Sequence, residues 1–111
     1  MRVVIIFAVI IFGVASSAMA HPPSKIEVKM TGAQVDITIY HDVSNPKAHY
    51  INNVVVNLNN KKVIEQKFNL QTDNYIQSVV YVMPGLVKGD RVEVEADCNK
   101  FGMLKYPVII E

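Results

Sequence analysis

Four side chains in this sequence have the chemistry of metal ligands: the imidazoles of His21, His41 and His49 and the thiol of Cys98. They are all of its histidines and its single cysteine. Imidazole and thiolate donors together suit iron, zinc or copper, whereas calcium and magnesium prefer oxygen donors. The alternative is that the histidines are merely solvated and that the cysteine packs as a small hydrophobic residue. A metal site therefore depends on whether the fold brings the four side chains together.

The first twenty residues have the three-part pattern of a secretory signal peptide. Arg2 is followed by an uncharged apolar stretch, residues 3–15, and small residues stand at Ala18 and Ala20. A spanning helix needs roughly 20 apolar residues and this stretch is shorter, although an uncleaved N-terminal anchor is the alternative interpretation. We expect cleavage after Ala20 and export to the periplasm or the extracellular space.

Residues 21–111 suffice for one small domain with a single core. They carry ten basic residues, which are the 11 of the whole chain without Arg2, and ten acidic ones. This balanced charge argues against nucleic acid as a partner and against docking on anionic lipid, so we expect neither nucleic acid nor, after cleavage, a membrane as partner. One cysteine allows no disulfide within the chain, so the core must stabilise the fold unless a metal contributes.

The sequence after the leader alternates apolar and polar residues with period two, which is typical of β-strands. Seven strands are predicted, over residues 26–30, 35–40, 50–58, 61–68, 75–83, 91–96 and 106–110. The first two should pair as a hairpin. Without any helical pattern, seven short strands predict an all-β, seven-stranded antiparallel sandwich of immunoglobulin-like type. The positions predicted to face the core are Ile26, Val28, Val35, Ile37, Ile39, Val54, Val56, Val80, Val82, Val92 and Val94.

Three short motifs resemble those of the superoxide reductases, the desulfoferrodoxin and neelaredoxin group. His21-Pro22-Pro23 is similar to the family's first His-x-Pro turn. The segment from His41 to His49-Tyr50-Ile51 resembles its His-Pro…His-Tyr-Ile segment, and Cys98-Asn99-Lys100-Phe101-Gly102 resembles its Cys-Asn-x-His-Gly. The motifs occur in the family's order and span nearly all of residues 21–111. That family is a seven-stranded immunoglobulin-like sandwich that holds one non-haem iron with four histidines and a cysteine.

The resemblance implies an iron site formed by His21, His41, His49 and Cys98, with superoxide as substrate, peroxide as product and a redox protein as electron donor. The sequence departs from the family where Phe101 replaces the fourth histidine. A second departure is Asn45-Pro46, because the family has its second histidine directly before the proline. His41 can serve as that ligand only if an insertion has remodelled the loop.

A third departure is the absence of the family's Glu-Lys pair before the first histidine, where this chain has Met19-Ala20. Two alternatives to the reductase stay open: a non-catalytic binder of copper or iron that uses the same residues, and a metal-free sandwich that binds a protein or cell-surface partner. Cleavage before His21 would also free an α-amine beside the His21 ring. An α-amine has a pKa of about 7.7–8.0, so a metal can displace its proton, and amine plus ring would chelate copper as readily as iron.

Overall fold

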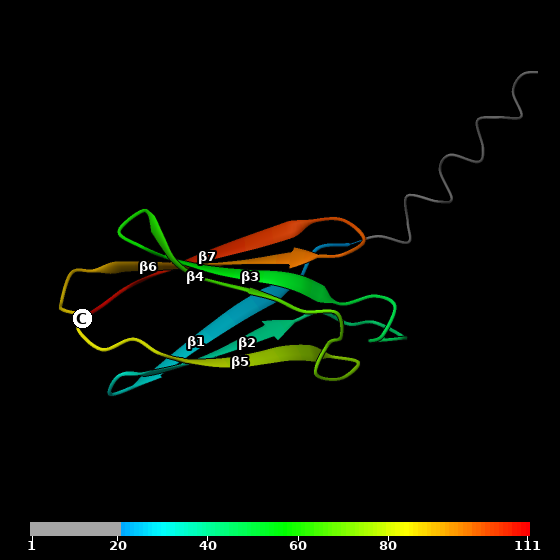
Figure 1. The fold of residues 1–111 in the computed structure, drawn as a ribbon, viewed down its shortest axis with the longest axis horizontal. Coiled ribbons are helices and arrows are strands. Elements are labelled where there is room, and N and C mark those ends of the chain that lie inside the picture. Colours follow the sequence, from blue (N-terminus) through cyan, green and yellow to red (C-terminus); the bar gives the residue numbers. More distant parts are fainter. Residues whose placement is uncertain (1–20) are drawn as a thin grey trace, which may run out of the picture.

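The computed structural model describes residues 21–111, so the predicted signal peptide lies outside the described residues. Seven antiparallel strands form two sheets that stack face to face (Figure 1). The first sheet contains, in spatial order, β1 (Lys25–Thr31), β2 (Gln34–Tyr40) and β5 (Ile76–Val82). The second contains β4 (Lys61–Lys67), β3 (Ile51–Leu58), β6 (Arg91–Cys98) and β7 (Met103–Ile109). The predicted seven-stranded sandwich is confirmed, and residues 21–111 contain no helix.

None of the described residues belongs to a helix that is long and apolar enough to span a membrane.

Tight turns set the register of the β1–β2 and β3–β4 hairpins. β1 pairs with β2 from Lys25–Tyr40 to Thr31–Gln34, which confirms the predicted hairpin. β3 turns into β4 through Asn59-Asn60, whose φ angles are 51° and 70°. Two successive left-handed residues are typical of the type I′ turn, which matches the twist of paired strands, and asparagine tolerates this conformation.

The core lies between the two sheets and is filled by alternate residues of the strands. Fully buried members include Val35, Ile37, Ile39, Val54, Val56, Val92 and Val94, all predicted from the sequence. Burying one such side chain contributes roughly 1.5–3 kcal/mol, and with no disulfide this packing must hold the fold.

The prediction that Val80 and Val82 face the core is wrong, because these residues are 56% and 70% exposed. Val79 and Tyr81 face inward instead, with Gln77 buried on the same side of β5. Adjacent valines allow the period-two pattern to be read in either phase, and a shift of one residue exchanges the two faces of a strand. Because Gln77 is polar, the face that it shares with Val79 and Tyr81 was predicted to be exposed to solvent.

Strand ends place the candidate ligands at one end of the sandwich. β6 continues to Cys98, two residues beyond its predicted end, and β7 begins at Met103 instead of Tyr106 because Met103 pairs with Asp97. The short β6–β7 turn therefore reaches the same end as the segment before β1 and the β2–β3 loop (Figure 1). The end of β7 lies at the opposite end of the molecule.

Candidate metal centre

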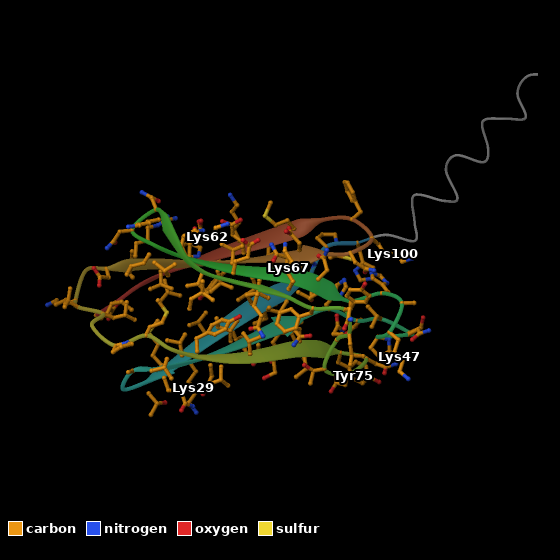
Figure 2. The ribbon with its side chains drawn as sticks, in the orientation of Figure 1. Lys29, Lys47, Lys62, Lys67, Tyr75 and Lys100 are labelled. Carbon is orange, nitrogen blue, oxygen red and sulfur yellow. The ribbon has the colours of Figure 1, made fainter. Side chains whose placement is uncertain are left out.

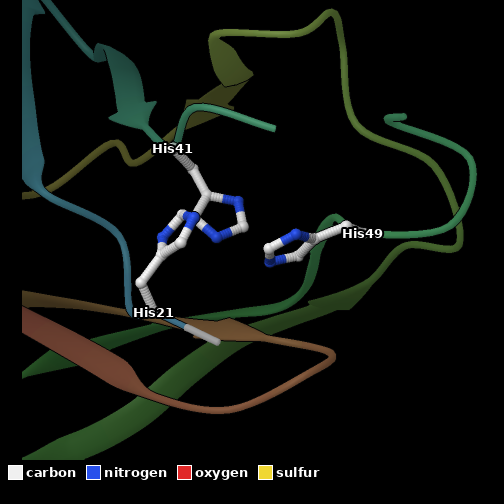
Figure 3. Close-up of side chains that lie close together, drawn as sticks. All are labelled: His21, His41 and His49. Carbon is white, nitrogen blue, oxygen red and sulfur yellow. The ribbon is translucent and has the colours of Figure 1, made fainter. Parts of the chain in front are cut away.

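The three histidines converge although they are far apart in sequence. His21 precedes β1, His41 directly follows β2, and His49 lies in the loop before β3 (Figure 3). Each contributes one ring nitrogen to a group whose atoms lie within 4.8 Å of one another. The ring centroids are 4.8 to 5.1 Å apart. Three imidazoles this close, without a carboxylate among them, are the arrangement expected of transition-metal ligands.

His41 is the buried member of the group, with 1% of its surface exposed. Its backbone N–H donates to the Tyr75 carbonyl at 2.9 Å, which continues the pairing of β2 with the segment entering β5. Its Nδ1 lies 2.8 Å from Oε1 of Gln71, whereas its Nε2 is buried without any hydrogen-bond partner. An unpaired buried polar atom is costly, and a bound metal ion would satisfy it.

The loop that carries His49 is held by its own backbone. The Asn45 carbonyl accepts N–H groups from Ala48 and His49 at 3.0 and 2.9 Å, which closes a tight turn after Pro46. Desolvation, followed by the charges of His41, His21 and Lys100, holds the pKa of His49 below the ordinary 6.5. The lowered pKa favours the neutral imidazole, which has a lone pair free for a metal.

Cys98 joins the group through His49. Its Sγ lies 3.2 Å from Nε2 of His49 and accepts the Lys100 backbone N–H at 3.3 Å. The thiol is 7% exposed, at the last position of β6. Backbone N–H donors to a metal-bound thiolate are one of the means by which proteins tune such a site.

Asn99 fastens the turn after Cys98 to the loop of His49. Its Oδ1 accepts the Tyr50 N–H at 2.9 Å, and its Nδ2 donates to the Ala48 carbonyl at 3.1 Å. Its backbone N–H donates to the Tyr50 carbonyl at 3.0 Å. These three bonds span the residues on both sides of His49, so the imidazole and the thiol are held by one connected unit.

His21 is partly exposed, and its Nδ1 lies 3.3 Å from the Pro22 carbonyl. A hollow of about 170 Å³ adjoins the cluster and is lined by His21, Pro22, Ser24, His41 and Asp42. The cluster therefore has a side that small molecules can reach from solvent.

Phe101, which stands where the resemblance expects a fourth imidazole, is 72% exposed. The structure thus brings His21, His41, His49 and Cys98 to one place, and a turn closed by the Asn45 carbonyl lies between His41 and His49. Gln71 was not predicted as a functional residue, because it lies in the connection between β4 and β5 and belongs to no motif.

The residues present fit a metal ion. They offer three imidazoles and a thiol, and one imidazole nitrogen is buried without a partner. Nitrogen and sulfur donors of this kind suit iron, copper or zinc.

Neither a scan against protein-family models nor a search of curated proteins gave a match. Solved structures do match. A superoxide reductase from Giardia intestinalis aligns with a TM-score of 0.62 at 18% identity, over 81% of this chain and 100% of that one. The chain has the fold of the superoxide reductases.

Two further solved structures agree with this assignment of the fold. The neelaredoxin-type superoxide reductase from Ignicoccus hospitalis has a TM-score of 0.55 at 18% identity, over 86% of this chain and 84% of that one. A hypothetical protein from Pyrococcus horikoshii has a TM-score of 0.55 at 19% identity, over 82% and 88%. In this chain the segment before β1 and the β2–β3 loop, which carry the three histidines, lie at one end of the sandwich (Figure 1).

Proposed function

We propose that this protein is an exported, mononuclear non-haem iron protein of the superoxide reductase type. The observation that carries the proposal is the group of three imidazoles within 4.8 Å, beside a buried thiol 3.2 Å from one of them. The reaction is the one-electron reduction of superoxide, in which one superoxide, one electron and two protons give hydrogen peroxide. Electrons come from a redox protein, and the protons come from water.

His21, His41, His49 and Cys98 would hold the iron, which supplies the transferred electron when bound. The buried Nε2 of His41 would gain the partner that it lacks. Thiolate ligation donates electron density and lowers the potential of an iron site, which favours electron transfer to substrate. The Lys100 N–H at Sγ moderates that donation.

The surroundings of the cluster suit a small anion. His21 is partly exposed and borders the hollow of about 170 Å³, which exceeds the size of a diatomic molecule. Lys47 and Lys100 lie at the same end of the sandwich (Figure 2). Positive side chains near an open site raise the local concentration of anions, so these lysines would attract superoxide to this end of the sandwich, although the carboxylate of Asp42 also lines the hollow.

Export is part of this proposal, and the leader pattern of residues 1–20 supports it. The periplasm or the extracellular space would then be the site of action.

A second candidate is a non-catalytic binder of copper or iron, which the exposed Phe101 favours because this position lacks a fourth imidazole. With four donors instead of five, the site has fewer constraints on the metal, and Cu²⁺ exceeds Fe²⁺ in intrinsic affinity for such ligands. A metal-free sandwich that binds a protein partner is the remaining alternative.

Metal content and visible spectrum separate these functions. Protein produced with its own leader would be purified without oxygen and loaded with Fe²⁺, then oxidised. One iron per chain, a thiolate-to-iron absorption band and stoichiometric conversion of superoxide to peroxide support the reductase. Tight binding of copper without iron supports the non-catalytic metal binder. The absence of any stoichiometric metal supports the metal-free sandwich.

Two variants test the ligands, with Val82→Ala as a control because Val82 is exposed on β5. Cys98→Ser should remove the absorption band and most of the metal, since a hydroxyl is a much poorer donor than a thiolate. His49→Ala should also weaken binding. If both variants keep the metal content of the control, the proposed site does not exist.

A further inference from the structure

Gln71 is a buried amide that has a complete set of hydrogen bonds around His41. Its side chain belongs to a residue that is 1% exposed, in the connection between β4 and β5. Oε1 lies 2.8 Å from Nδ1 of His41 and accepts the Ile51 N–H at 3.2 Å. Nε2 donates to the carbonyls of His41 and Asp73 at 2.8 and 3.0 Å. All four bonds that a primary amide can make are therefore made.

The backbone groups around Gln71 fix which end of the amide faces the imidazole. The carbonyls of His41 and Asp73 can only accept, so the amide NH₂ must lie on their side. The Ile51 N–H can only donate, so the oxygen must lie on its side. The reversed amide would place oxygen against two carbonyls and NH₂ against an N–H, so none of these three backbone groups would keep its hydrogen bond.

The orientation of the amide determines the tautomer of His41. Since Oε1 of Gln71 is an acceptor without a hydrogen, Nδ1 of His41 must carry the proton to bond with it. In the neutral ring Nε2 then has the lone pair. Nε2 is the buried atom without a partner, on a ring whose centroid lies within 5.0 Å of those of His21 and His49.

We infer that Gln71 is a positioning residue that holds His41 as the Nδ1–H tautomer and presents its Nε2 lone pair to the other two imidazoles. Metal-bound histidines commonly donate their second ring N–H to a carboxylate or carbonyl group, which fixes the ring and raises its basicity. Here a side-chain amide takes that place. Where it concerns metal affinity, the inference rests on the proposed function; where it concerns the tautomer, it does not.

The tautomer can be measured without metal. Long-range ¹H–¹⁵N correlation spectra of chelator-treated protein distinguish a protonated Nδ1 from a protonated Nε2 in each ring. The expected result is that His41 of the unaltered protein carries its proton on Nδ1 at neutral pH. A proton on Nε2 would overturn the inference, whether or not the protein binds metal.

Gln71→Met replaces the amide by a side chain of similar length that has no acceptor. The spectra should then show the Nε2–H tautomer of His41 appearing, and Fe²⁺ and Co²⁺ titrations should show affinity falling about tenfold to a hundredfold, as is common for such outer partners of a ligand. Gln77→Met is the matched control, because Gln77 is 5% exposed and its amide donates to the Ser78 carbonyl and not to His41. In the Gln77→Met variant, the tautomer of His41 and the metal affinity should match those of the unaltered protein, even if the melting temperature falls.

Gln71→Glu tests the acceptor alone. The carboxylate can accept the Nδ1–H and the Ile51 N–H but cannot replace the two donated bonds, so stability should fall while the Nδ1–H tautomer is kept. Metal affinity should stay closer to that of the unaltered protein than in Gln71→Met.

The inference is wrong if Gln71→Met and Gln77→Met have the same tautomer of His41 and affinities within about twofold. If the unaltered protein binds neither Fe²⁺ nor Co²⁺, the proposed function fails, and the spectra still decide whether Gln71 sets the tautomer. If Gln71→Met does not fold, the unaltered protein and Gln71→Glu give the decision.

Discussion

Gly102 lies against Pro22 so closely that it has no room for a side chain. A Cβ on Gly102 would lie 2.7 Å from Cβ of Pro22, and the φ of Gly102 is +106°. Pro22 follows His21 directly, and the Gly102 carbonyl accepts the Cys98 N–H at 2.9 Å. The turn that follows Cys98 thus packs against the segment that carries His21.

We therefore expect Gly102→Ala to destabilise the fold and to weaken metal binding. A non-glycine residue in this backbone region costs about 1–3 kcal/mol, and the collision with Pro22 adds to it. Gly85→Ala is the matched control, because Gly85 has φ +93° with nothing near the added Cβ. Chemical unfolding and Fe²⁺ titration of both variants measure the difference. Equal stability losses and equal affinities would show that the contact with Pro22 does not matter.

Phe101→His should restore a fourth imidazole beside Cys98 and raise iron affinity. Phe101 is 72% exposed, so its replacement costs little burial and the melting temperature should change little. Met103→His serves as the control, since Met103 is also an exposed apolar residue and begins the next strand. Fe²⁺ titration and superoxide turnover would be compared. An affinity no higher than that of Met103→His would show that residue 101 cannot reach the site.

Glu65 should stabilise the protein in a pH-dependent way. Hydrogen bonds from Lys62 and Asn53, with the nearby charge of Lys62, hold its pKa at about 2, below the ordinary 4.5. A depressed carboxyl pKa contributes stability that is present above pH 4.5 and is lost as the pH falls towards 2. The melting temperature of Glu65→Gln should thus lie below that of the unaltered protein near neutral pH and approach it near pH 2. The effect should be small because the pair is exposed, and a pH-independent difference would contradict this assignment.

The exported protein should begin at His21, with a mass that lacks residues 1–20. Mass spectrometry of protein from the periplasm or the medium measures this directly, and an intact leader would instead indicate an anchor. An alanine inserted between Ala20 and His21 then tests the α-amine: weaker Cu²⁺ binding would identify the amine as a ligand. Unchanged binding would leave the ring alone in that role.

The sequence by itself determined the fold, because period-two alternation and turn residues are local properties. It predicted seven strands, the β1–β2 hairpin and most of the core, since an alternating strand with one apolar face can bury that face in only one way. β5 is the exception. Its neighbouring valines left two phases open, and only packing against the other sheet decided that Val79 faces inward and Val80 outward.

The sequence also supplied the four candidate ligands, because histidine and cysteine are recognisable by their chemistry alone. Their proximity was decided by the tertiary structure, since His21, His41, His49 and Cys98 lie on segments that meet only when the two sheets stack. The contact of Gly102 with Pro22 and the bonds of Gln71 to His41 were decided in the same way. A hydrogen bond between residues 30 positions apart leaves no spacing in the sequence, because its geometry depends on the path of the whole chain between them.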